Sequence, residues 1–231
     1  MDKIIPLIIS IIDGETKYSV DKDALNFIEQ QTTDILLPLT SELFLCEASK
    51  YFEKREEYNK NIKLLMNNEL KLIKDIFNDI AAHIAIMSSV NAGTNLLGFS
   101  DVDIGICVEK LNTDDDNLDN YLFTIIKNKL IDCGYKENKV FNENNPKNRY
   151  FPFTKKIGDQ EFEVKVRDLK TSQTIIKLHE YLDNKLSEER QMLYTYLKFL
   201  TFENKEIYKK LKKIIYESAF SHIDGGFVMF M

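Results

Sequence analysis

Residues 91–108 read Asn-Ala-Gly-Thr-Asn-Leu-Leu-Gly-Phe-Ser-Asp-Val-Asp-Ile-Gly-Ile-Cys-Val, and this segment is the most informative part of the sequence. Its second half predicts a β-strand, because aliphatic residues alternate with polar or small residues from position 101 onward. Residues i and i+2 of a strand share one face and lie roughly 6.5 Å apart at Cα. Asp101 and Asp103 therefore direct two carboxylates to one side of the strand, while aliphatic side chains bury the other side.

Two features of this stretch suit the binding of metal ions and phosphate groups. Two divalent cations about 3.5–4 Å apart need a shared platform of carboxylates, which Asp101 and Asp103 provide. Gly93 lies upstream of the strand, where a glycine allows backbone N–H groups to approach phosphate oxygens closely. The hydroxyl of Thr94 adds a further hydrogen-bond donor beside that glycine.

The order of these residues resembles the signature of the polymerase-β-like nucleotidyltransferase superfamily. That motif has Gly-Ser or Gly-Gly on a turn, often a second glycine, and then Ser-Asp-x-Asp at the start of the next strand. The corresponding residues here are Gly93-Thr94, Gly98 and Ser100-Asp101-Val102-Asp103. Threonine replaces the usual serine and keeps its hydroxyl, and the interval between Gly98 and Asp101 is shorter than in most members. The resemblance covers roughly residues 80–168.

The resemblance also implies a third acidic residue on a later strand. Residues 150–167 predict a β-hairpin with a turn at Gly158-Asp159, and alternate residues of its second strand share a polar face. Glu163 fits the third acidic position best, because hydrophobic residues flank it on both sides. Glu161 on the same face is the alternative, and the family more often has aspartate than glutamate at this position.

Other polar residues near these acids have both a functional and a structural interpretation. Lys165 would contact a phosphate group or pair with Glu161. Ser100 would hydrogen-bond a phosphate group or stabilise its own turn. In a purely structural interpretation, the two glutamates form an acid–base ladder across an exposed hairpin, with Lys155, Lys165 or Arg167 as the bases.

The resemblance implies a two-metal transfer reaction. Asp101 and Asp103 would hold two cations, Mg²⁺ or Mn²⁺, and Glu163 would bind the cation at the acceptor hydroxyl and act as general base. Gly93 and Thr94 would bind the triphosphate of an NTP such as ATP. We therefore expect an enzyme that moves NMP from an NTP to a hydroxyl group and releases pyrophosphate.

The expected acceptor is the 3′ end of an RNA, as in terminal uridylyl or adenylyl transferases, because helical flanks on both sides of the core suit a bilobal polymerase plan. A small molecule, a protein or a second nucleotide is the alternative acceptor, as in antitoxin-like and second-messenger-making branches. A third possibility is a non-catalytic nucleotide-binding relative. The complete set of Asp101, Asp103 and Glu163 argues against that third possibility.

Composition restricts the class of protein. The chain has 231 residues, with 44% hydrophobic and 29% charged residues, as in ordinary globular domains. It has no run of about 18 apolar residues that would predict a membrane span. Three widely spaced cysteines are typical of reduced thiols, so we expect a cytoplasmic protein. The net charge of −6 argues against tight binding to duplex nucleic acid but permits a short single-stranded RNA.

We expect an α+β fold, in which a nucleotidyltransferase-like mixed sheet is flanked by helices and by a helical lobe. Residues 83–168 would form the catalytic core, and residues 1–82 and 169–231 would form the mainly helical flanks that build the lobe. The nucleotide would lie in the cleft between this lobe and the sheet.

The expected local elements follow from hydrophobic periodicity and turn residues. The N-terminal region would have a turn at Asp13-Gly14 and a loop over residues 32–40. We expect helices from Ser41, over residues 61–83, 117–130 and 171–186, from Ser187 as N-cap, and over residues 206–220. Gly134 would end the helix over residues 117–130 as its C′ residue. We also expect a strand over residues 84–91 and a loop over residues 136–149.

Two further patterns in the C-terminal region have alternative explanations. Lys205, Lys209, Lys212 and Lys213 lie on one helix face, which is either a solvated surface or a site for a triphosphate or RNA backbone. Tyr194 or Tyr196 would stack on the nucleobase, as aromatic residues of the helical lobe do in the family. The apolar tail, residues 224–231, would add a strand or dock in a groove.

Overall fold

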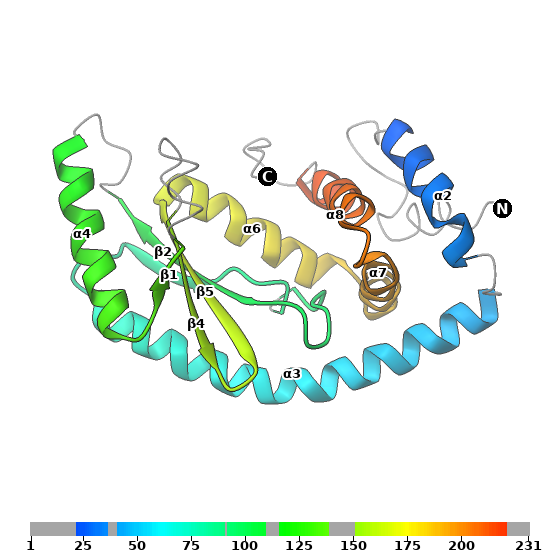
Figure 1. Cartoon of the computed structure of the whole chain (residues 1–231), viewed down its shortest axis with the longest axis horizontal. Coiled ribbons are helices and arrows are strands. Elements are labelled where there is room, and N and C mark those ends of the chain that lie inside the picture. Colours follow the sequence, from blue (N-terminus) through cyan, green and yellow to red (C-terminus); the bar gives the residue numbers. More distant parts are fainter. Residues whose placement is uncertain (1–21, 37–40, 91, 110–115, 139–150, 221–231) are drawn as a thin grey trace. The chain divides into compact units, whose positions relative to one another are not determined.

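The computed structural model describes residues 22–36, 41–90, 92–109, 116–138 and 151–220. Within these residues the fold is α+β, with six helices and one open mixed sheet of five strands (Figure 1). The predicted turn at Asp13-Gly14 and the apolar tail over residues 224–231 lie outside the described residues. No helix in the described ranges is long and apolar enough to cross a membrane.

The sheet has the strand order β1-β2-β5-β4-β3. The two central strands, β2 and β5, run parallel, and every other neighbouring pair is antiparallel. Their core-facing residues, among them Val102, Ile104, Phe162 and Val164, are fully buried. The strand bounds are His83–Ile86 for β1, Val102–Val108 for β2, Lys136–Glu137 for β3, Phe151–Ile157 for β4 and Gln160–Asp168 for β5.

The predicted hairpin is confirmed as β4 and β5. Ile157 pairs with Gln160 across a two-residue turn, Gly158-Asp159. Gly158 has a φ of 61°, which glycine adopts without the steric penalty of a side chain. The loop predicted over residues 136–149 is wrong at its start, because Lys136 and Glu137 pair with β4 as the short strand β3.

Helix α4, Asp116–Asp132, agrees with the predicted helix over residues 117–130. Gly134 follows it with a φ of 87°, the left-handed conformation that ends many helices. The backbone N–H of Tyr135 then donates to the carbonyl of Leu130 at 3.0 Å. The predicted glycine stop is therefore confirmed.

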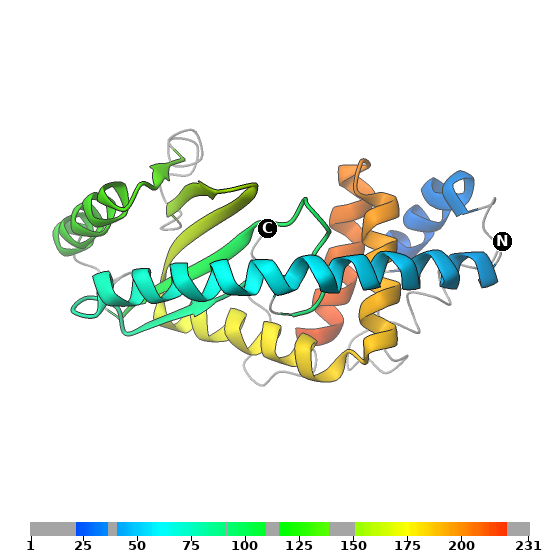
Figure 2. The same cartoon turned by 90° about the horizontal axis from the view of Figure 1, so that it is seen from below.

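The two helices predicted from Ser41 and over residues 61–83 form one continuous helix, α3, Ser41–Phe77 (Figure 2). No proline or glycine interrupts residues 41–77, so the polar residues between the two apolar patterns continue the same helix. The predicted strand over residues 84–91 is also too long, since β1 ends at Ile86.

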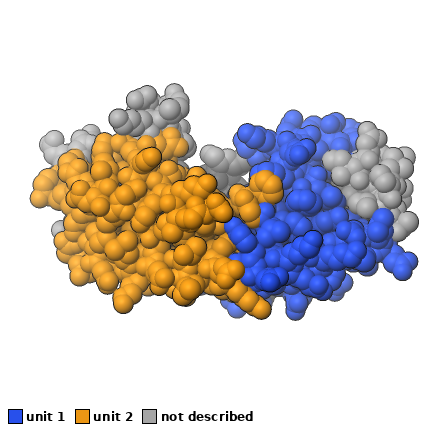
Figure 3. All heavy atoms as spheres, turned by 60° about the horizontal axis from the view of Figure 1, so that its bottom comes forward, with its two compact units in different colours: residues 1–58, 92–97, 177–231 blue, residues 59–91, 98–176 orange. Residues whose placement is uncertain are grey.

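The chain divides into two compact units (Figure 3). Unit 1 comprises residues 1–58, 92–97 and 177–231, and unit 2 comprises residues 59–91 and 98–176. Unit 2 contains the sheet. Unit 1 is built from helices, including helix α2, Lys22–Leu36, helix α7, Glu188–Thr201, and helix α8, Lys205–Phe220. Helix α6, Leu169–Lys185, contributes its second half to unit 1.

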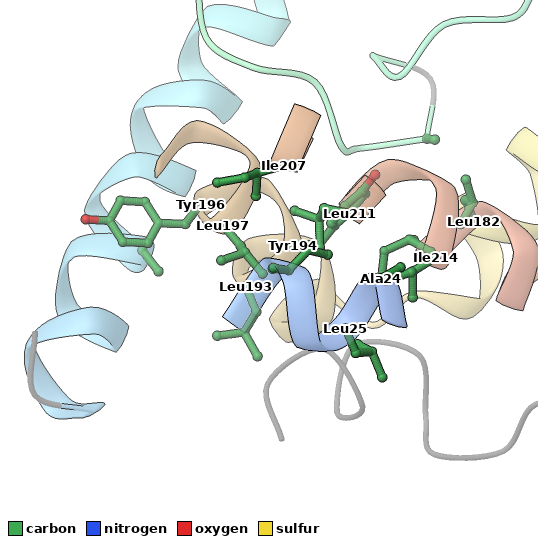
Figure 4. Packing of buried hydrophobic residues seen from close by; sticks show 14 of the residues in the cluster. Ala24, Leu25, Leu182, Leu193, Tyr194, Tyr196, Leu197, Ile207, Leu211 and Ile214 are labelled. Carbon is green, nitrogen blue, oxygen red and sulfur yellow. The ribbon is translucent and has the colours of Figure 1, made fainter. Parts of the chain in front are cut away.

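Unit 1 has its own hydrophobic core, in which α2 packs against α8 (Figure 4). Helix α2 corrects the prediction of a loop over residues 32–40, because residues 32–36 are helical. Leu25 and Ile28 are buried, and the hydroxyl of Thr32 donates to the carbonyl of Ile28 at 2.6 Å. A buried threonine thus continues the apolar stripe of the helix.

Ser187 is confirmed as the N-cap of α7. Its hydroxyl oxygen accepts a hydrogen bond from the backbone N–H of Arg190 at 3.3 Å. The helix then directs its apolar face into the core of unit 1, including Tyr194 and Tyr196 (Figure 4).

Candidate metal-binding site

Three carboxylates meet on one face of the central strand pair in unit 2. One carboxylate oxygen from each of Asp101, Asp103 and Glu163 lies within 4.8 Å of the others, and all three residues are partly buried. Asp103 belongs to β2, Asp101 directly precedes that strand, and Glu163 belongs to β5. We call these three residues the carboxylate cluster.

Strand register explains why these side chains meet. Asp103 on β2 is paired with Glu163 on β5, and the two strands are parallel. Their preceding residues, Val102 and Phe162, are register partners that are fully buried on the opposite face. Because side chains alternate along a strand, burial of that aliphatic and aromatic pair forces both acids to the same side of the sheet.

Lys165 is a cationic partner of this cluster. Its Nζ lies 2.5 Å from Asp103 Oδ1 and 2.9 Å from Glu163 Oε2. All three side chains are mostly buried, with exposed fractions of 16% for Lys165, 19% for Asp103 and 17% for Glu163. The sequence predicted a phosphate group or Glu161 as partner of Lys165, or either glutamate in the structural interpretation. The contact with Glu163 agrees with that last alternative, and the contact with Asp103 was not predicted.

The acid–base ladder of the structural interpretation forms in part, through the ion pair of Lys165 with Glu163. Lys155 lies 2.8 Å from the Glu69 carboxylate rather than beside the glutamates of β5. Glu161 is exposed, and it does not belong to the carboxylate cluster. The side chain of Arg167 lies outside the described part of the structure.

The electrostatics of the cluster favour a cation. The pKa of Glu163 is raised to about 7, mainly because the carboxyl group is buried. The Lys165 ammonium opposes this shift, and the carboxylates of Asp103 and Asp101 contribute to it. A carboxyl group in this environment holds its proton more tightly than in water because its negative charge is poorly solvated. A divalent cation would favour the ionised form.

The donor chemistry fits a hard divalent cation. Three carboxylates from two adjacent strands offer only oxygen ligands, which Mg²⁺, Mn²⁺ and Ca²⁺ prefer over nitrogen and sulfur. The cluster is the one group of at least three acidic, histidine or cysteine residues with this spacing in the described ranges. Cysteine and histidine do not contribute to it.

The turn after β1 is a part of the site that the sequence did not single out. The hydroxyl of Ser88 donates to the carbonyl of Asp101 at 3.2 Å and accepts from the backbone N–H of Val90 at 3.1 Å. The backbone N–H of Met87 donates to the carbonyl of Asp103 at 2.8 Å. The turn thus fixes the backbone of both aspartates. The only sequence signal is a small hydroxyl residue directly after a strand, which is common in turns.

Met87 also fills the space beside Gly105, which follows Asp103 on the same face of β2. A Cβ atom on Gly105 would lie 2.1 Å from Met87 Cε and 2.4 Å from its sulfur. Gly105 is the register partner of Lys165. The glycine therefore admits the methionine side chain next to the lysine stem.

The predicted phosphate-binding residues Gly93 and Thr94 are described with unit 1. Gly93 has a φ of 62°, and a Cβ atom there would lie 2.5 Å from the side-chain oxygen of Gln191. Thr94 is buried, and its hydroxyl has no hydrogen-bond partner among the described atoms. Phosphate binding by these two residues stays a prediction, and the same holds for Ser100, whose carbonyl accepts from Gln160 Nε2 at 2.9 Å.

Two buried cations hold the Gly93-Thr94 segment within unit 1. The guanidinium of Arg55 donates to the carbonyl of Gly93, and to the hydroxyl of Thr195 at 2.9 Å. Lys198 Nζ donates to the carbonyl of Thr94 at 2.5 Å. Burial lowers the pKa of Arg55 from its ordinary value, although the adjacent Glu56 opposes this change. The backbone of this turn is therefore anchored to helices α3 and α7.

The aromatic residues predicted to stack on a nucleobase are core residues instead. Tyr194 is fully buried, Tyr196 is 8% exposed, and both pack in the core of unit 1 (Figure 4). On α8, Lys205 and Lys209 are exposed, as expected for a solvated helix face, whereas Lys212 and Lys213 are partly buried. A role of that basic face in binding a triphosphate or RNA stays a prediction.

No protein-family model matches the chain, and comparisons with curated proteins and with solved structures gave no match.

Proposed function

We propose that this chain is a metal-dependent nucleotidyltransferase, which moves NMP from an NTP to a hydroxyl group. The observation that carries the proposal is the approach of the Asp101, Asp103 and Glu163 carboxylates to within 4.8 Å on adjacent strands. The Gly-Thr and Ser-Asp-x-Asp pattern adds the order of residues that nucleotidyltransferases of the polymerase-β type have.

Asp101, Asp103 and Glu163 would hold the divalent cations, Mg²⁺ or Mn²⁺. When bound, such cations neutralise the charge of the triphosphate and lower the pKa of the acceptor hydroxyl. Phosphate contacts by Gly93 and Thr94, whose backbone and hydroxyl would serve as donors, belong to the same proposal.

The proposed reaction is an in-line displacement at the α-phosphorus, for which this chain supplies the base. The acceptor oxygen forms a bond to the α-phosphorus, the bond from that phosphorus to the oxygen bridging the β-phosphate breaks, and pyrophosphate leaves. The acceptor proton passes to the Glu163 carboxylate, which acts as general base.

The 3′ hydroxyl of a single-stranded RNA is the acceptor that we propose. The test supplies each α-labelled NTP with Mg²⁺ or Mn²⁺, with and without a short single-stranded RNA. The inactive comparison is the Asp101→Ala/Asp103→Ala variant. A matched control is Asp159→Ala, which removes an exposed acid from the β4–β5 turn of the same unit.

A ladder of extended RNA, lost in the double variant and kept in Asp159→Ala, is the expected result. If label moves only to protein or to a small molecule, the acceptor is one of these alternatives and not RNA. Absence of transfer under every condition, with equal Mn²⁺ binding by the wild type and the double variant, would overturn the proposed metal-dependent activity.

A further inference from the structure

The Lys165 ammonium stands at a position where a cation would bind the carboxylate cluster. It contacts one oxygen of Asp103 at 2.5 Å and one oxygen of Glu163 at 2.9 Å. These are the same two residues that pair across β2 and β5 and that supply cluster oxygens. A divalent cation bound by Asp103 and Glu163 through those oxygens would compete with the ammonium for the same negative charge.

Charge counting supports this competition. At pH 8, above the pKa of Glu163, three ionised carboxylates carry −3. The lysine reduces this charge to −2, and a divalent cation in place of its ammonium would reduce it to −1. All of the side chains that form the ion pairs are mostly buried, so water screens these charges only weakly. Without Lys165, the metal-free cluster would lose this compensating charge in a poorly solvated place.

The backbone fixes the lysine near the cluster. Lys165 is two residues from Glu163 on β5, so the two side chains share one face of the sheet. Its register partner is Gly105, a residue without a side chain that could displace the lysine stem. The flexible four-carbon stem still allows the ammonium to leave the carboxylates without movement of the strand.

We propose that Lys165 is a resident counter-ion of the carboxylate cluster, and that a divalent cation binds by displacing its ammonium from Asp103 and Glu163. Lys165 thereby sets the concentration of divalent cation at which the site fills. It also stabilises the metal-free protein. This inference rests on the metal site of the proposed function but not on the transfer reaction.

The test measures Mn²⁺ binding by isothermal titration calorimetry at pH 8 and constant ionic strength. Lys165→Met keeps the length of the side chain and removes its charge, so it should bind Mn²⁺ at least about tenfold more tightly than the wild type. Lys156→Met is the matched control, because Lys156 is exposed and faces Glu161 in the neighbouring strand. It should change the affinity by less than about twofold.

A second measurement uses the wild-type protein and does not depend on folding of a variant. Nitrogen-15 NMR of lysine ammonium groups should give a protected signal for Lys165, assigned by its loss in Lys165→Arg. Saturating Mg²⁺ should shift this signal or abolish it by opening the ammonium to water. An unchanged signal at saturation would overturn displacement.

The outcomes separate the two proposals. The counter-ion role would be overturned if Lys165→Met bound Mn²⁺ no more tightly than the wild type. If Asp101→Ala/Asp103→Ala abolished the wild-type binding in the same experiment, the metal site itself would remain in place. Absence of specific Mn²⁺ binding in both the wild type and Lys165→Met would overturn the counter-ion role together with the metal site.

Discussion

Asp103 and Glu163 are register partners on two parallel strands and direct their carboxylates to the same face of the sheet. They lie far apart in sequence, and the pairing of β2 with β5 is what brings them together. A shift of this register by one residue would place Phe162 or Val164 beside Asp103 and remove Glu163 from the cluster. The acidic site thus depends on the pairing of the two central strands.

The two glutamates of β5 provide a matched pair of variants. We expect Glu163→Gln to lower nucleotidyl transfer at least about 100-fold, because it removes a ligand charge from the cluster. Glu161→Gln, on the same strand but outside the cluster, should stay within about twofold of the wild type. Steady-state rates at saturating Mg²⁺ measure both. Equal losses in the two variants would contradict the assignment of Glu163.

Stability without metal should depend on pH through Glu163. Since the folded-state pKa of Glu163 is raised to about 7, the folded protein binds more protons than the unfolded chain above the ordinary pKa near 4.5. This contribution to stability is complete below pH 4.5 and is lost as the pH rises through 7. Between pH 5 and 8, the free energy of unfolding should fall more in the wild type than in Glu163→Gln, by on the order of 2 kcal/mol.

Urea unfolding in the presence of a chelator measures this difference. Saturating Mg²⁺ should reduce the pH dependence, because the bound cation keeps the carboxylate ionised at lower pH. Parallel curves for the wild type and Glu163→Gln across the whole range would contradict the raised pKa.

Gly105→Ala should destabilise unit 2. The new methyl group would lie 2.1 Å from the buried Met87 side chain, so the methionine must move within a packed interior. We expect a loss of about 1–3 kcal/mol in the free energy of unfolding. In the Met87→Ala background, where the long side chain is absent, Gly105→Ala should lower the free energy of unfolding by less than it does in the wild type. Thermal and urea unfolding of the wild type, the two single variants and the double variant measure this difference. If the two substitutions change the free energy of unfolding additively, the contact between Met87 and position 105 is contradicted.

Arg55→Met should destabilise unit 1. The guanidinium is fully buried and donates to the carbonyl of Gly93 and the hydroxyl of Thr195, which would then lose a buried partner. A loss of about 3 kcal/mol is expected. Lys50→Met is the control, because its ion pair with Glu47 is exposed, and it should have no measurable effect. A small effect of Arg55→Met in urea unfolding would mean that water replaces these hydrogen bonds.

Local patterns in the sequence predicted several elements for identifiable physical reasons. The Gly158-Asp159 turn between two alternating segments predicted the hairpin, and Ser187 and Gly134 predicted helix ends. Each of these features depends on neighbouring residues alone. Helix α2 was missed, because its apolar stripe includes Thr32, a polar residue that only the packing of unit 1 buries.

Helix α3 illustrates the limit of periodicity. Two apolar patterns separated by charged residues predicted two helices, yet the same residues form one helix from Ser41 to Phe77. Charged residues are good helix formers, so a polar interval does not by itself mark a break. Likewise, the motif order drew attention to Gly93 and Thr94, whereas hydrogen bonds to the backbone of Asp101 come from Ser88.

Side chains alternate along any strand, so the spacing of the residues is enough to place Asp101 and Asp103 on one face of a first strand and Glu161, Glu163 and Lys165 on one face of a second. The assembled sheet then brings Glu163 rather than Glu161 to the aspartates and pairs Lys165 with Asp103 and Glu163. The reason is that strand order and register arise from hydrogen bonds and burial between segments distant in sequence. These contacts leave no signature in the spacing of neighbouring residues.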